Sequence, residues 1–600
     1  MCGYMQQSKW ILIAFVMVAT IACSRTAPAM ETPQVAPTPR ANIPALEVPP
    51  TERRVESIDS LIASMTLREK IGQLVMPWLL GDYTAFGTAE FDRISTWIDS
   101  LRLGGIIISI GSPLDATAKL NALQRRSPLP LLIAADLEWG SAMRLVGGTA
   151  FPMAMGIGAT DRELDAYELG RVTALEARAA GIHMTFSPVA DVNNNPNNPI
   201  INTRSFGEDP EATSRLVAAY VRGANEHGLF TTAKHFPGHG DTQSDSHINM
   251  PVVSACWDRL DTVELVPFRA AIEAGVTAVM TAHIALPCID GEEDPPPATL
   301  SRAVMTGILR DSLGFNGLVV TDALTMGAII QKYGVGETVV KAFLAGSDLL
   351  LIPADPAEAI EAMANAVESG RIPAERLDLS VHKMLALKEQ AGLFRQRTVP
   401  LDSIPAKIGL REYQEIADDI AARSITVVQE GPIEDFRQKR GRTAVIMYAE
   451  ETNLNIGNTL IGELRALGER VYPFRLYPAS GPMSYDSARA VIANNPRVVF
   501  AAGVRFIAGR GHIQFPDSLA SLIVETQHRR PTVLAALGSP YLLNQLTGFT
   551  GGYLLAWADF EATERATARA LGGRAPITGR LPITLSEEYP RGFGIDFLHR

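Results

Sequence analysis

Cysteine is scarce in this sequence: the 600 residues contain four, and two of them, Cys2 and Cys23, stand near the N-terminus. A small disulfide scaffold is therefore excluded, because such folds replace a hydrophobic core with many closely spaced cysteines. Cys256 and Cys288 can form one bridge only if their Cα atoms come within about 7 Å. Their spacing leaves two alternatives open, a single bridge and two independent packing residues.

Positive charge is also in deficit. The chain has 54 lysines and arginines against 65 aspartates and glutamates, which gives a formal net charge of −11. Proteins that bind nucleic acid gather Lys and Arg on one face, so we expect no nucleic-acid partner. The C-terminal third lacks the glycine-rich phosphate loops G-x-G-x-x-G and G-x-x-x-x-G-K-[ST], and a nucleotide role has no support there.

The N-terminus carries an apolar run, residues 10–22, that is too short to span a bilayer comfortably. It ends in Ile-Ala-Cys23, which resembles the end of a bacterial lipobox; Thr20 departs from that pattern, so cleavage without lipidation is the alternative. Residues 24–54 are rich in proline and contain no aromatic residue, which is typical of a tether. We expect residues 1–23 to be a signal peptide, and the protein to be exported, either periplasmic or anchored to the bacterial envelope through a lipid on Cys23.

From residue 55 onward, short apolar runs alternate with longer amphipathic segments, and Thr66-Leu-Arg-Glu69 is a capping box before the first of them. Continuous hydrophobicity is typical of strands buried on both faces, and connections of helix length indicate parallel pairing. Eight such units predict a (β/α)8 TIM-type barrel over residues 55–400, with an open doubly wound sheet as the alternative. The candidate strands are Ile71 to Leu80, Gly105 to Ile110, Leu131 to Asp136, His183 to Pro188, Leu229 to His235, Val276 to His283, Leu318 to Asp322 and Asp348 to Ile352.

A second alternation of strands and helices follows the helix that ends near Phe394. A chain of this length is too long for one hydrophobic core, so we expect residues 401–600 to form a smaller α/β sandwich domain. Its candidate strands are Thr443 to Tyr448, Val498 to Gly503, Thr532 to Leu537 and Tyr553 to Trp557.

The densest polar cluster is Lys234-His-Phe-Pro-Gly-His-Gly-Asp-Thr-Gln-Ser-Asp-Ser-His247, at the end of the fifth candidate strand. In a barrel, that end of the strand belongs to the catalytic face. His235, His239 and His247 could ligate zinc, although the loop is broken by glycine and proline and contains no H-E-x-x-H. The other interpretation is that Asp245 orients His247, which then gives and takes a proton near neutral pH.

A second carboxylate stands where a barrel enzyme needs one. Asp322 ends the seventh candidate strand, Gly317-Leu-Val-Val-Thr-Asp, and a buried strand that ends in Asp presents that side chain at the mouth of the barrel. A retaining glycosidase uses one group to attack the anomeric carbon and a second as acid and then base, and Asp322 and His247 fit these roles. The alternative is that Asp322 only caps the following helix.

The segment 234–247 resembles the K-H-F-P-G-H-G-x-x-x-x-D-[ST]-H signature of the β-N-acetylglucosaminidase branch of glycoside hydrolase family 3, in its two-domain form. The pattern is long and specific. Other segments are similar to family segments in the same order, so the resemblance covers nearly everything after Val55. These segments are 65–74, 191–193, 204–207, 317–329 and 579–582.

The resemblance implies an exo-acting, retaining β-N-acetylglucosaminidase with Asp322 as nucleophile and His247 as acid/base, held by Asp245. It implies neither a metal nor an organic cofactor. The Asp-Ser-His sequence favours N-acetylglucosaminides over glucosides, because the family's β-glucosidases take a Glu from the second domain instead. The same comparison implies a set of side chains that hold sugar hydroxyls, namely Asp136, Arg204, Lys234 and His235, with Arg144 and His283 as further candidates.

One segment departs from the family, which often shows Asp-x-Glu-Gly-Gly before an Arg. This chain reads Asp136-Leu-Glu-Trp-Gly-Ser-Ala-Met-Arg144. Trp139 can stack on a sugar face or fill the corner between strand and helix, and we favour packing.

Four alternatives to this function are a family-related β-glucosidase, an N-acetylglucosaminide phosphorylase, a zinc-dependent hydrolase and a non-catalytic carbohydrate-binding protein. Phosphorolysis enters because a histidine repels phosphate less than a second carboxylate does. The presence of Asp322, Asp245 and His247 disfavours the non-catalytic alternative. The expected natural substrates are peptidoglycan fragments with terminal N-acetylglucosamine, and chitin oligosaccharides are the alternative.

Overall fold

The structure is a computed structural model that describes residues 57–244, 250–291, 294–449, 454–507 and 509–598. The predicted signal peptide and linker, residues 1–54, lie outside the described residues, and so do Asp245 and His247. None of the described helices is both long and apolar enough to cross a membrane.

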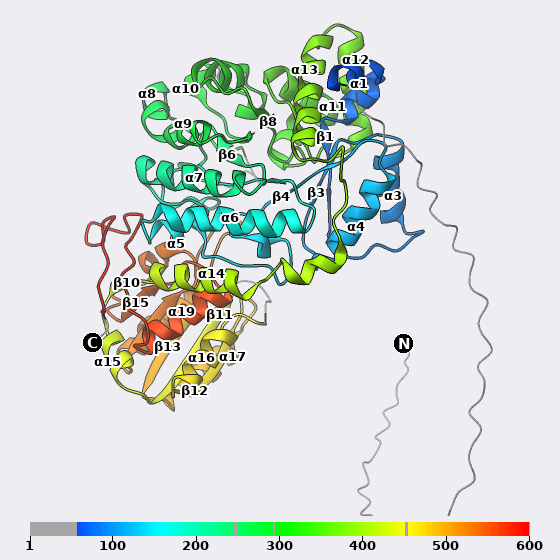
Figure 1. Cartoon of the computed structure of the whole chain (residues 1–600). Helices are drawn as coiled ribbons and strands as arrows, with labels where there is room; N and C mark the ends of the chain where they lie inside the picture. Colours follow the sequence, from blue (N-terminus) through cyan, green and yellow to red (C-terminus); the bar gives the residue numbers. More distant parts are fainter. Residues whose placement is uncertain (1–56, 245–249, 292–293, 450–453, 508, 599–600) are drawn as a thin grey trace, which may run out of the picture. The chain divides into compact units, whose positions relative to one another are not determined.

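Short strands alternate with helices from Val75 to Leu351 (Figure 1). Each of the eight segments predicted to contain a strand does contain one, and Pro77 divides the first strand in two. That first prediction began too early, because Ile71 lies in helix α2 (Leu67–Gly72), whose capping box is confirmed. The strands are β1 (Val75–Met76), β2 (Trp78–Leu79), β3 (Gly105–Ile108), β4 (Leu132–Ala135), β5 (Met184–Thr185), β6 (Thr232–Phe236), β7 (Ala278–Thr281), β8 (Leu318–Val320) and β9 (Leu350–Leu351).

These strands pair in parallel, in the orders β2-β3-β4-β5, β6-β7-β8 and β1-β9. Isolated parallel bridges from Met184 to Phe230 and from Val320 to Leu349 link neighbouring groups of strands. The longer strands are buried at every residue, as their continuous hydrophobicity predicted. The expected parallel α/β architecture is confirmed, and it brings side chains at the carboxyl ends of different strands to the same edge.

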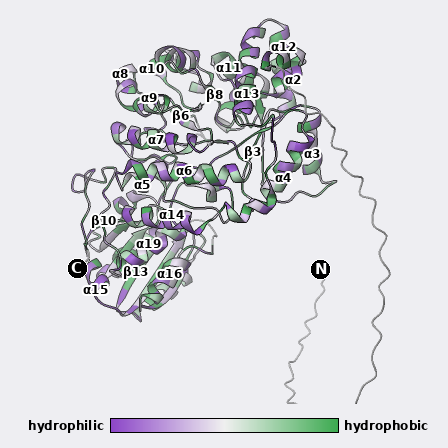
Figure 2. Cartoon of the chain, viewed as in Figure 1, coloured by the Kyte–Doolittle hydropathy of each residue, from purple (hydrophilic) through white to green (hydrophobic). Residues whose placement is uncertain are grey.

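Amphipathic helices connect the strands, and Figure 2 shows their polar residues against the hydrophobic strands. Helix α7, for example, buries Leu216, Val217 and Tyr220. Its N-cap is Asp209, whose side chain accepts a hydrogen bond from the Ala212 amide. The other helices of this region are α1 (Ile58–Ser64), α3 (Ala89–Asp99), α4 (Pro113–Arg126), α5 (Ala154–Gly158), α6 (Glu163–Ala179), α7 itself (Pro210–Asn225), α8 (Trp257–Arg259), α9 (Val266–Glu273), α10 (Pro287–Asp290), α11 (Gly327–Ala345), α12 (Pro356–Glu368) and α13 (Ala374–Gln390).

A six-stranded sheet of order β10-β15-β14-β13-β11-β12 follows in the C-terminal region. Its strands are parallel except for β10, which runs antiparallel to β15. The four predicted strands are confirmed, whereas β10 and β12 were not predicted; both are edge strands, and β12 is fully buried only at Val471 and Leu476 and contains two arginines. The strands are β10 (Thr426–Gln429), β11 (Arg442–Ala449), β12 (Arg470–Leu476), β13 (Arg497–Gly503), β14 (Thr532–Ala536) and β15 (Gly552–Leu555).

Helices cover both faces of this sheet, as an α/β sandwich requires. One face packs with α14, α16 and α19 through alternate residues such as Val445 and Val499, and the other packs with α17 and α18 through Ile446 and Phe500. The helices are α14 (Arg411–Ser424), α15 (Ile433–Gln438), α16 (Asn458–Ala466), α17 (Pro482–Ala493), α18 (Asp517–Gln527) and α19 (Glu561–Leu571).

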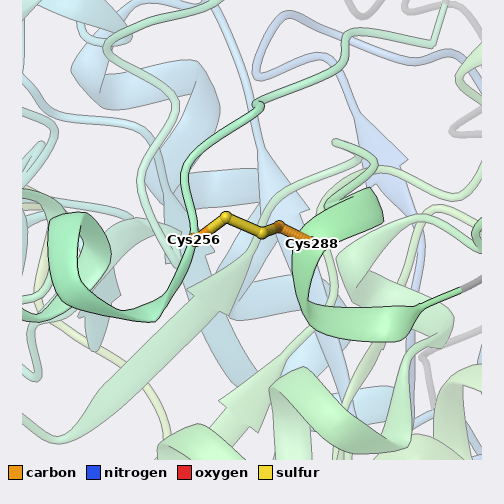
Figure 3. The surroundings of a disulfide bond; sticks show 2 residues. All are labelled: Cys256 and Cys288. Atoms are coloured by element: carbon orange, nitrogen blue, oxygen red, sulfur yellow. A yellow bond between two sulfur atoms is a disulfide. The ribbon is translucent and has the colours of Figure 1, made fainter.

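Cys256 and Cys288 form a disulfide, with their Cα atoms 5.1 Å apart (Figure 3). Cys256 is the residue before α8, and Cys288 lies in α10 after β7. Of the two alternatives that the sequence left open, the single bridge is therefore correct. The bridge therefore joins the segment before α8 to the connection that follows β7.

Several polar contacts hold the C-terminal sheet region against the preceding strands and helices. Asn193 donates a hydrogen bond to the Tyr541 hydroxyl over 2.8 Å, and the Thr584 amide and hydroxyl donate to the Glu208 carboxylate over 2.8 and 2.7 Å. They join the segments after β14 and after α19 to the connection between β5 and α7.

Candidate active site

A cavity of about 470 Å³ lies at the carboxyl ends of the parallel strands. Asp136 follows β4 directly, Lys234 and His235 lie in β6, and Asp322 stands two residues after β8. The sequence predicted these residues from four separate segments, and the structure brings six of them to the cavity wall. They are Asp136, Arg144, Arg204, Lys234, His235 and Asp322.

A network of buried charges forms one wall. Lys234 Nζ lies 2.9 Å from Asp136 Oδ1 and 2.7 Å from Glu138 Oε1. Arg204 binds both oxygens of Glu138 over 2.8 and 2.9 Å, and Arg144 reaches Asp136 over 3.0 Å. The side chains of Lys234, Glu138 and Arg204 are less than a tenth exposed. Each charge thus has a partner, as buried charges require.

The network keeps all of its members ionised. Burial alone raises the pKa of Glu138, but the Arg204 and Lys234 charges outweigh it and hold that pKa well below its usual value. Asp136 follows the same pattern, with Lys234 and Arg144 lowering its pKa against burial. Burial lowers the pKa of Lys234, and the two carboxylates raise it above its usual value.

Glu138 is the member that sequence reasoning missed. It stands two residues after Asp136, so a continued extended backbone carries both carboxylates to the same side. The family pattern Asp-x-Glu contains a Glu at this position, so the sequence did carry a signal for Glu138 beside Trp139. That side chain lines the cavity and also stacks on Phe560, with ring centroids 5.6 Å apart. Trp139 therefore packs on a ring of the C-terminal region, and its place on the cavity wall leaves stacking on a sugar as the other alternative.

Asp191 holds His235, in β6, and His239, in the loop that follows β6. Its fully buried carboxylate accepts hydrogen bonds from His235 Nδ1 over 2.7 Å and from the His239 backbone amide over 2.7 Å. Nε2 of His235 lies 3.3 Å from Arg204 Nη2, which can only donate, so Nε2 accepts while Nδ1 donates to Asp191. The ring of His235 is thereby fixed at the cavity wall.

His239 is a second buried histidine at this wall. Its Nδ1 lies 2.8 Å from the Thr242 hydroxyl, and burial followed by the nearby His235 lowers its pKa to about 4. The loop that carries it fits closely: a Cβ on Gly240 would come within 1.7 Å of the Val192 carbonyl oxygen, so the glycine of the sequence motif is required there. The third histidine of the zinc alternative, His247, lies outside the described residues, and that alternative stays untested.

Asp322 is partly exposed toward the cavity. Its backbone amide donates to the Thr281 hydroxyl over 3.3 Å, and its Oδ1 accepts from the Ala323 amide over 2.7 Å. The alternative that it caps the next helix is wrong, because α11 begins at Gly327 with Met326 as its N-cap.

His283 lies behind the wall and is not among the residues that line the cavity. Its ring is fully buried, with Nδ1 2.7 Å from the Thr299 hydroxyl and Nε2 3.0 Å from the Ala323 carbonyl oxygen. It therefore contacts the residue after Asp322, a position from which it supports the Asp322 backbone.

The C-terminal region closes part of the cavity with Arg505, Phe506 and Ile507, which follow β13. The Arg204 guanidinium lies 5.3 Å from the centre of the Phe506 ring, and Arg505 Nε lies 3.4 Å from the Asp559 carboxylate. Sequence reasoning missed these residues because nothing local to residues 505–507 marks them as neighbours of β4 and β6.

The chain has relatives of known name. It is 29% identical to a β-N-acetylglucosaminidase/β-glucosidase of Cellulomonas fimi over 88% of this chain and 95% of that one. The solved family 3 β-N-acetylglucosaminidase of Paenibacillus sp. FPU-7 is 34% identical, with a TM-score of 0.79 over 87% of this chain and 99% of that one. The β-glucoside phosphorylase BglX with bound 2FGlc is 28% identical, with a TM-score of 0.79 over 88% and 96%. Residues 66–387, more than half of the chain, match the family described as the glycosyl hydrolase family 3 N-terminal domain, so the chain belongs to glycosyl hydrolase family 3.

Proposed function

We propose that the protein is an exo-acting, retaining β-N-acetylglucosaminidase that releases terminal N-acetylglucosamine. The observation that carries this proposal is the placement of Asp322 on the wall of a cavity that also presents Asp136, Arg204, Lys234 and His235. Paired carboxylates and cations offer both hydrogen-bond donors and acceptors, and sugar hydroxyls require both. The names of the Cellulomonas and Paenibacillus relatives support the choice of sugar.

In the proposed mechanism, an Asp322 oxygen attacks the anomeric carbon while the bond to the leaving oxygen breaks. His247, held by Asp245, gives its proton to that oxygen, and a covalent glycosyl-enzyme forms. His247 then takes a proton from water, which attacks the anomeric carbon and releases Asp322 and the sugar with retained configuration. His283 acts through the Ala323 carbonyl as a positioning residue for Asp322, and Asp191 does so for His235.

The strand pairings support a closed (β/α)8 barrel as the catalytic domain at residues 55–400. With β1 and β2 counted as one strand, each strand pairs with or bridges to the next, from β2 through β8, and β9 returns to β1. Residues 401–600 then form the second domain. Its contribution to catalysis is the wall formed by residues 505–507.

We assign the N-terminal 23 residues to a signal peptide of lipoprotein type, with Cys23 as the lipid attachment site and the bacterial envelope as the location. The apolar run and the proline-rich tether carry that assignment. Such a location fits peptidoglycan fragments as natural substrates, and chitin oligosaccharides are the second candidate.

The experiment compares hydrolysis of an aryl β-N-acetylglucosaminide and an aryl β-glucoside by the purified protein, with and without EDTA. We expect the first substrate to be preferred, EDTA to have no effect, and the released sugar to be the β-anomer by NMR. Preference for the glucoside would overturn the specificity, and loss of activity with EDTA would favour the zinc alternative. Phosphate in the buffer adds a third arm, because a sugar 1-phosphate product would identify a phosphorylase like BglX.

A further inference from the structure

A second cavity, of about 480 Å³, lies at the opposite ends of the same strands. Gly181 and His183, which line it, precede β5, whereas the catalytic residues follow the strands they belong to. Arg178 comes from the end of α6, and the far wall is the segment 391–399 that follows α13. Because the strands are parallel, this cavity and the catalytic one are at different faces of the protein.

The charges around the second cavity have one sign. Arg178, Arg395 and Arg397 line it, and no aspartate or glutamate is among its described lining residues. Two of these arginines bind neutral groups: Arg178 donates to the Ala391 carbonyl oxygen over 3.3 Å, and Arg397 donates to the Ser127 and Pro128 carbonyl oxygens over 2.9 and 3.4 Å. Nη1 of Arg178 is buried and, within the described part of the chain, has no hydrogen-bond partner.

His183 adds a further donor rather than an acceptor. Its Nδ1 accepts a hydrogen bond from the Ile133 amide over 3.0 Å, so the proton of the neutral ring is on Nε2. Burial, and then the charges of Arg178 and Lys388, hold the pKa of His183 far below its usual value. Lys388 is itself fully buried, and burial followed by the Arg397 charge lowers its pKa to about 7. Each of these groups therefore experiences like charge from its neighbours.

Contacts with carbonyl oxygens do not by themselves explain this cluster. A carbonyl satisfies an N–H group but supplies only a partial charge, and cations withdrawn from water are normally matched by a full negative charge; Arg178 and Arg397 are half-buried, whereas Arg395 is exposed. At the catalytic face the same protein pairs its buried cations with carboxylates. The second cavity has room for the missing counter-charge, and its donors come from three separate segments.

We propose that this cavity is a binding site for a small oxyanion of the phosphate or sulfate type, held by Arg178 and Arg397 with His183 Nε2 and the more exposed Arg395 as further donors. Guanidinium groups suit such a ligand because their planar N–H pairs match two oxygens of one anion. The bound anion links α6 to the segment 391–399, which leads from the strands to the C-terminal region. The site needs no part of the proposed catalytic function.

Isothermal titration of the purified full chain with inorganic phosphate, and separately with sulfate, tests this site at constant ionic strength. We expect saturable binding of one anion per chain. Arg395→Gln and Arg397→Gln should each weaken that binding about tenfold, the effect of one lost charged hydrogen bond. Arg489→Gln is the matched control, because this exposed arginine lies on α17 beside Asp486 and Glu525.

The outcomes separate the second cavity from the catalytic one. Absence of saturable binding in the unmodified chain overturns the proposal. Binding that is unchanged in both arginine variants, but is lost when N-acetylglucosamine is present in excess, places the anion at the catalytic cavity and also overturns it. Binding that is weakened in both variants and unaffected by the sugar supports it, whichever glycoside the enzyme hydrolyses.

Discussion

Two cavities of nearly equal size, about 470 and 480 Å³, lie at opposite ends of the same parallel strands. In the catalytic cavity, Lys234 and Arg204 bind Glu138, and Arg144 binds Asp136. In the second cavity, Arg178 and Arg397 donate to carbonyl oxygens, and no carboxylate is among the described lining residues. Size does not distinguish these sites, but the balance of charge does.

This difference in charge balance indicates which kind of ligand each cavity can bind. In the catalytic network every charge has an oppositely charged partner, so hydrogen-bond donors and acceptors are presented together, which matches the hydroxyl groups of a neutral sugar. An unbalanced cluster lacks acceptors and gains free energy when an anion supplies the missing charge. The following experiments test that contrast, in order of expected effect.

The largest effect should come from Asp322→Asn, because the amide cannot attack the anomeric carbon. We expect kcat for an aryl β-N-acetylglucosaminide to fall on the order of 10⁴-fold. Asp402→Asn, at an exposed carboxylate, is the control for the loss of a charge. Arg397→Gln should leave kcat within about twofold, because that residue is at the other cavity. A comparable loss of kcat in Arg397→Gln would break the separation of the two sites.

Glu138→Gln should destabilise the fold, because it leaves Lys234 and Arg204 buried with one carboxylate fewer. We expect the free energy of unfolding to fall by about 3 kcal/mol, measured by chemical denaturation. Glu361→Gln is the matched control, since its pair with Arg68 is half-exposed and worth less than about 1 kcal/mol.

The pH dependence sharpens this test. The pKa of Glu138 is held below its unfolded value near 4.5, so its contribution is present above that pH and is lost as the pH falls through the lower, folded value. The difference in the free energy of unfolding between the parent and the Glu138→Gln variant should therefore be constant above about pH 5.5 and shrink in acid. A difference that grows in acid would contradict the assigned ionisation.

His239→Gln tests the neutral state of the catalytic-face histidine. The pKa of His239 is about 4 in the fold and 6.5 in the unfolded chain, so it stabilises the fold above pH 6.5 and loses that contribution as the pH falls toward 4. As the pH falls from 6.5 to 4, the free energy of unfolding should fall by roughly 2–3 kcal/mol less in the variant than in the parent. Chemical denaturation at several pH values measures this difference. The exposed His382→Gln is the control. Equal acid sensitivity in variant and parent would show that His239 is not held neutral.

The smallest effect should come from Arg395→Gln. Because this arginine is exposed and no carboxylate is among the described residues that line its cavity, we expect the stability in chloride to change by less than about 0.5 kcal/mol. Phosphate should raise the melting temperature of the parent by about 1–2 °C above chloride at equal ionic strength, and this shift should be smaller in the variant. If phosphate raises the melting temperature of the Arg395→Gln variant as much as that of the parent, the proposed contrast between the two cavities is wrong.

The elements were predictable where local signals agree with burial. Continuous apolar runs located all nine strands from β1 to β9 and the four central strands of the second sheet. The edge strands β10 and β12 were missed because neither carries a long apolar run. Arg470–Leu476 contains two arginines and a proline, and β10, although mostly buried, has only Val427 and Val428 between Thr426 and Gln429. Asp322 was predicted from its place at the end of a strand, whereas the sugar-binding residues were implied by the family resemblance; six of the predicted residues line the cavity.

The remaining site residues depend on contacts that are distant in sequence. Glu138 and Asp191 act through partners 66 and 44 residues away, and Phe506 meets Arg204 across about half of the chain. His283 was expected to bind sugar, yet its ring is turned to the Ala323 carbonyl. Sequence spacing does not show whether a polar side chain such as His283 points into the cavity or away from it.

The sequence by itself determined the parallel α/β architecture, the family and the segments from which the site is built, because hydrophobic periodicity and a long motif are local properties of the chain. The tertiary structure decided which side chains pair, that Cys256 bonds to Cys288, that residues 505–507 form part of the catalytic cavity, and that a second cavity is left with unmatched positive charge. Charge balance is a property of neighbours in space, and those neighbours become known only when the strands and helices are packed together.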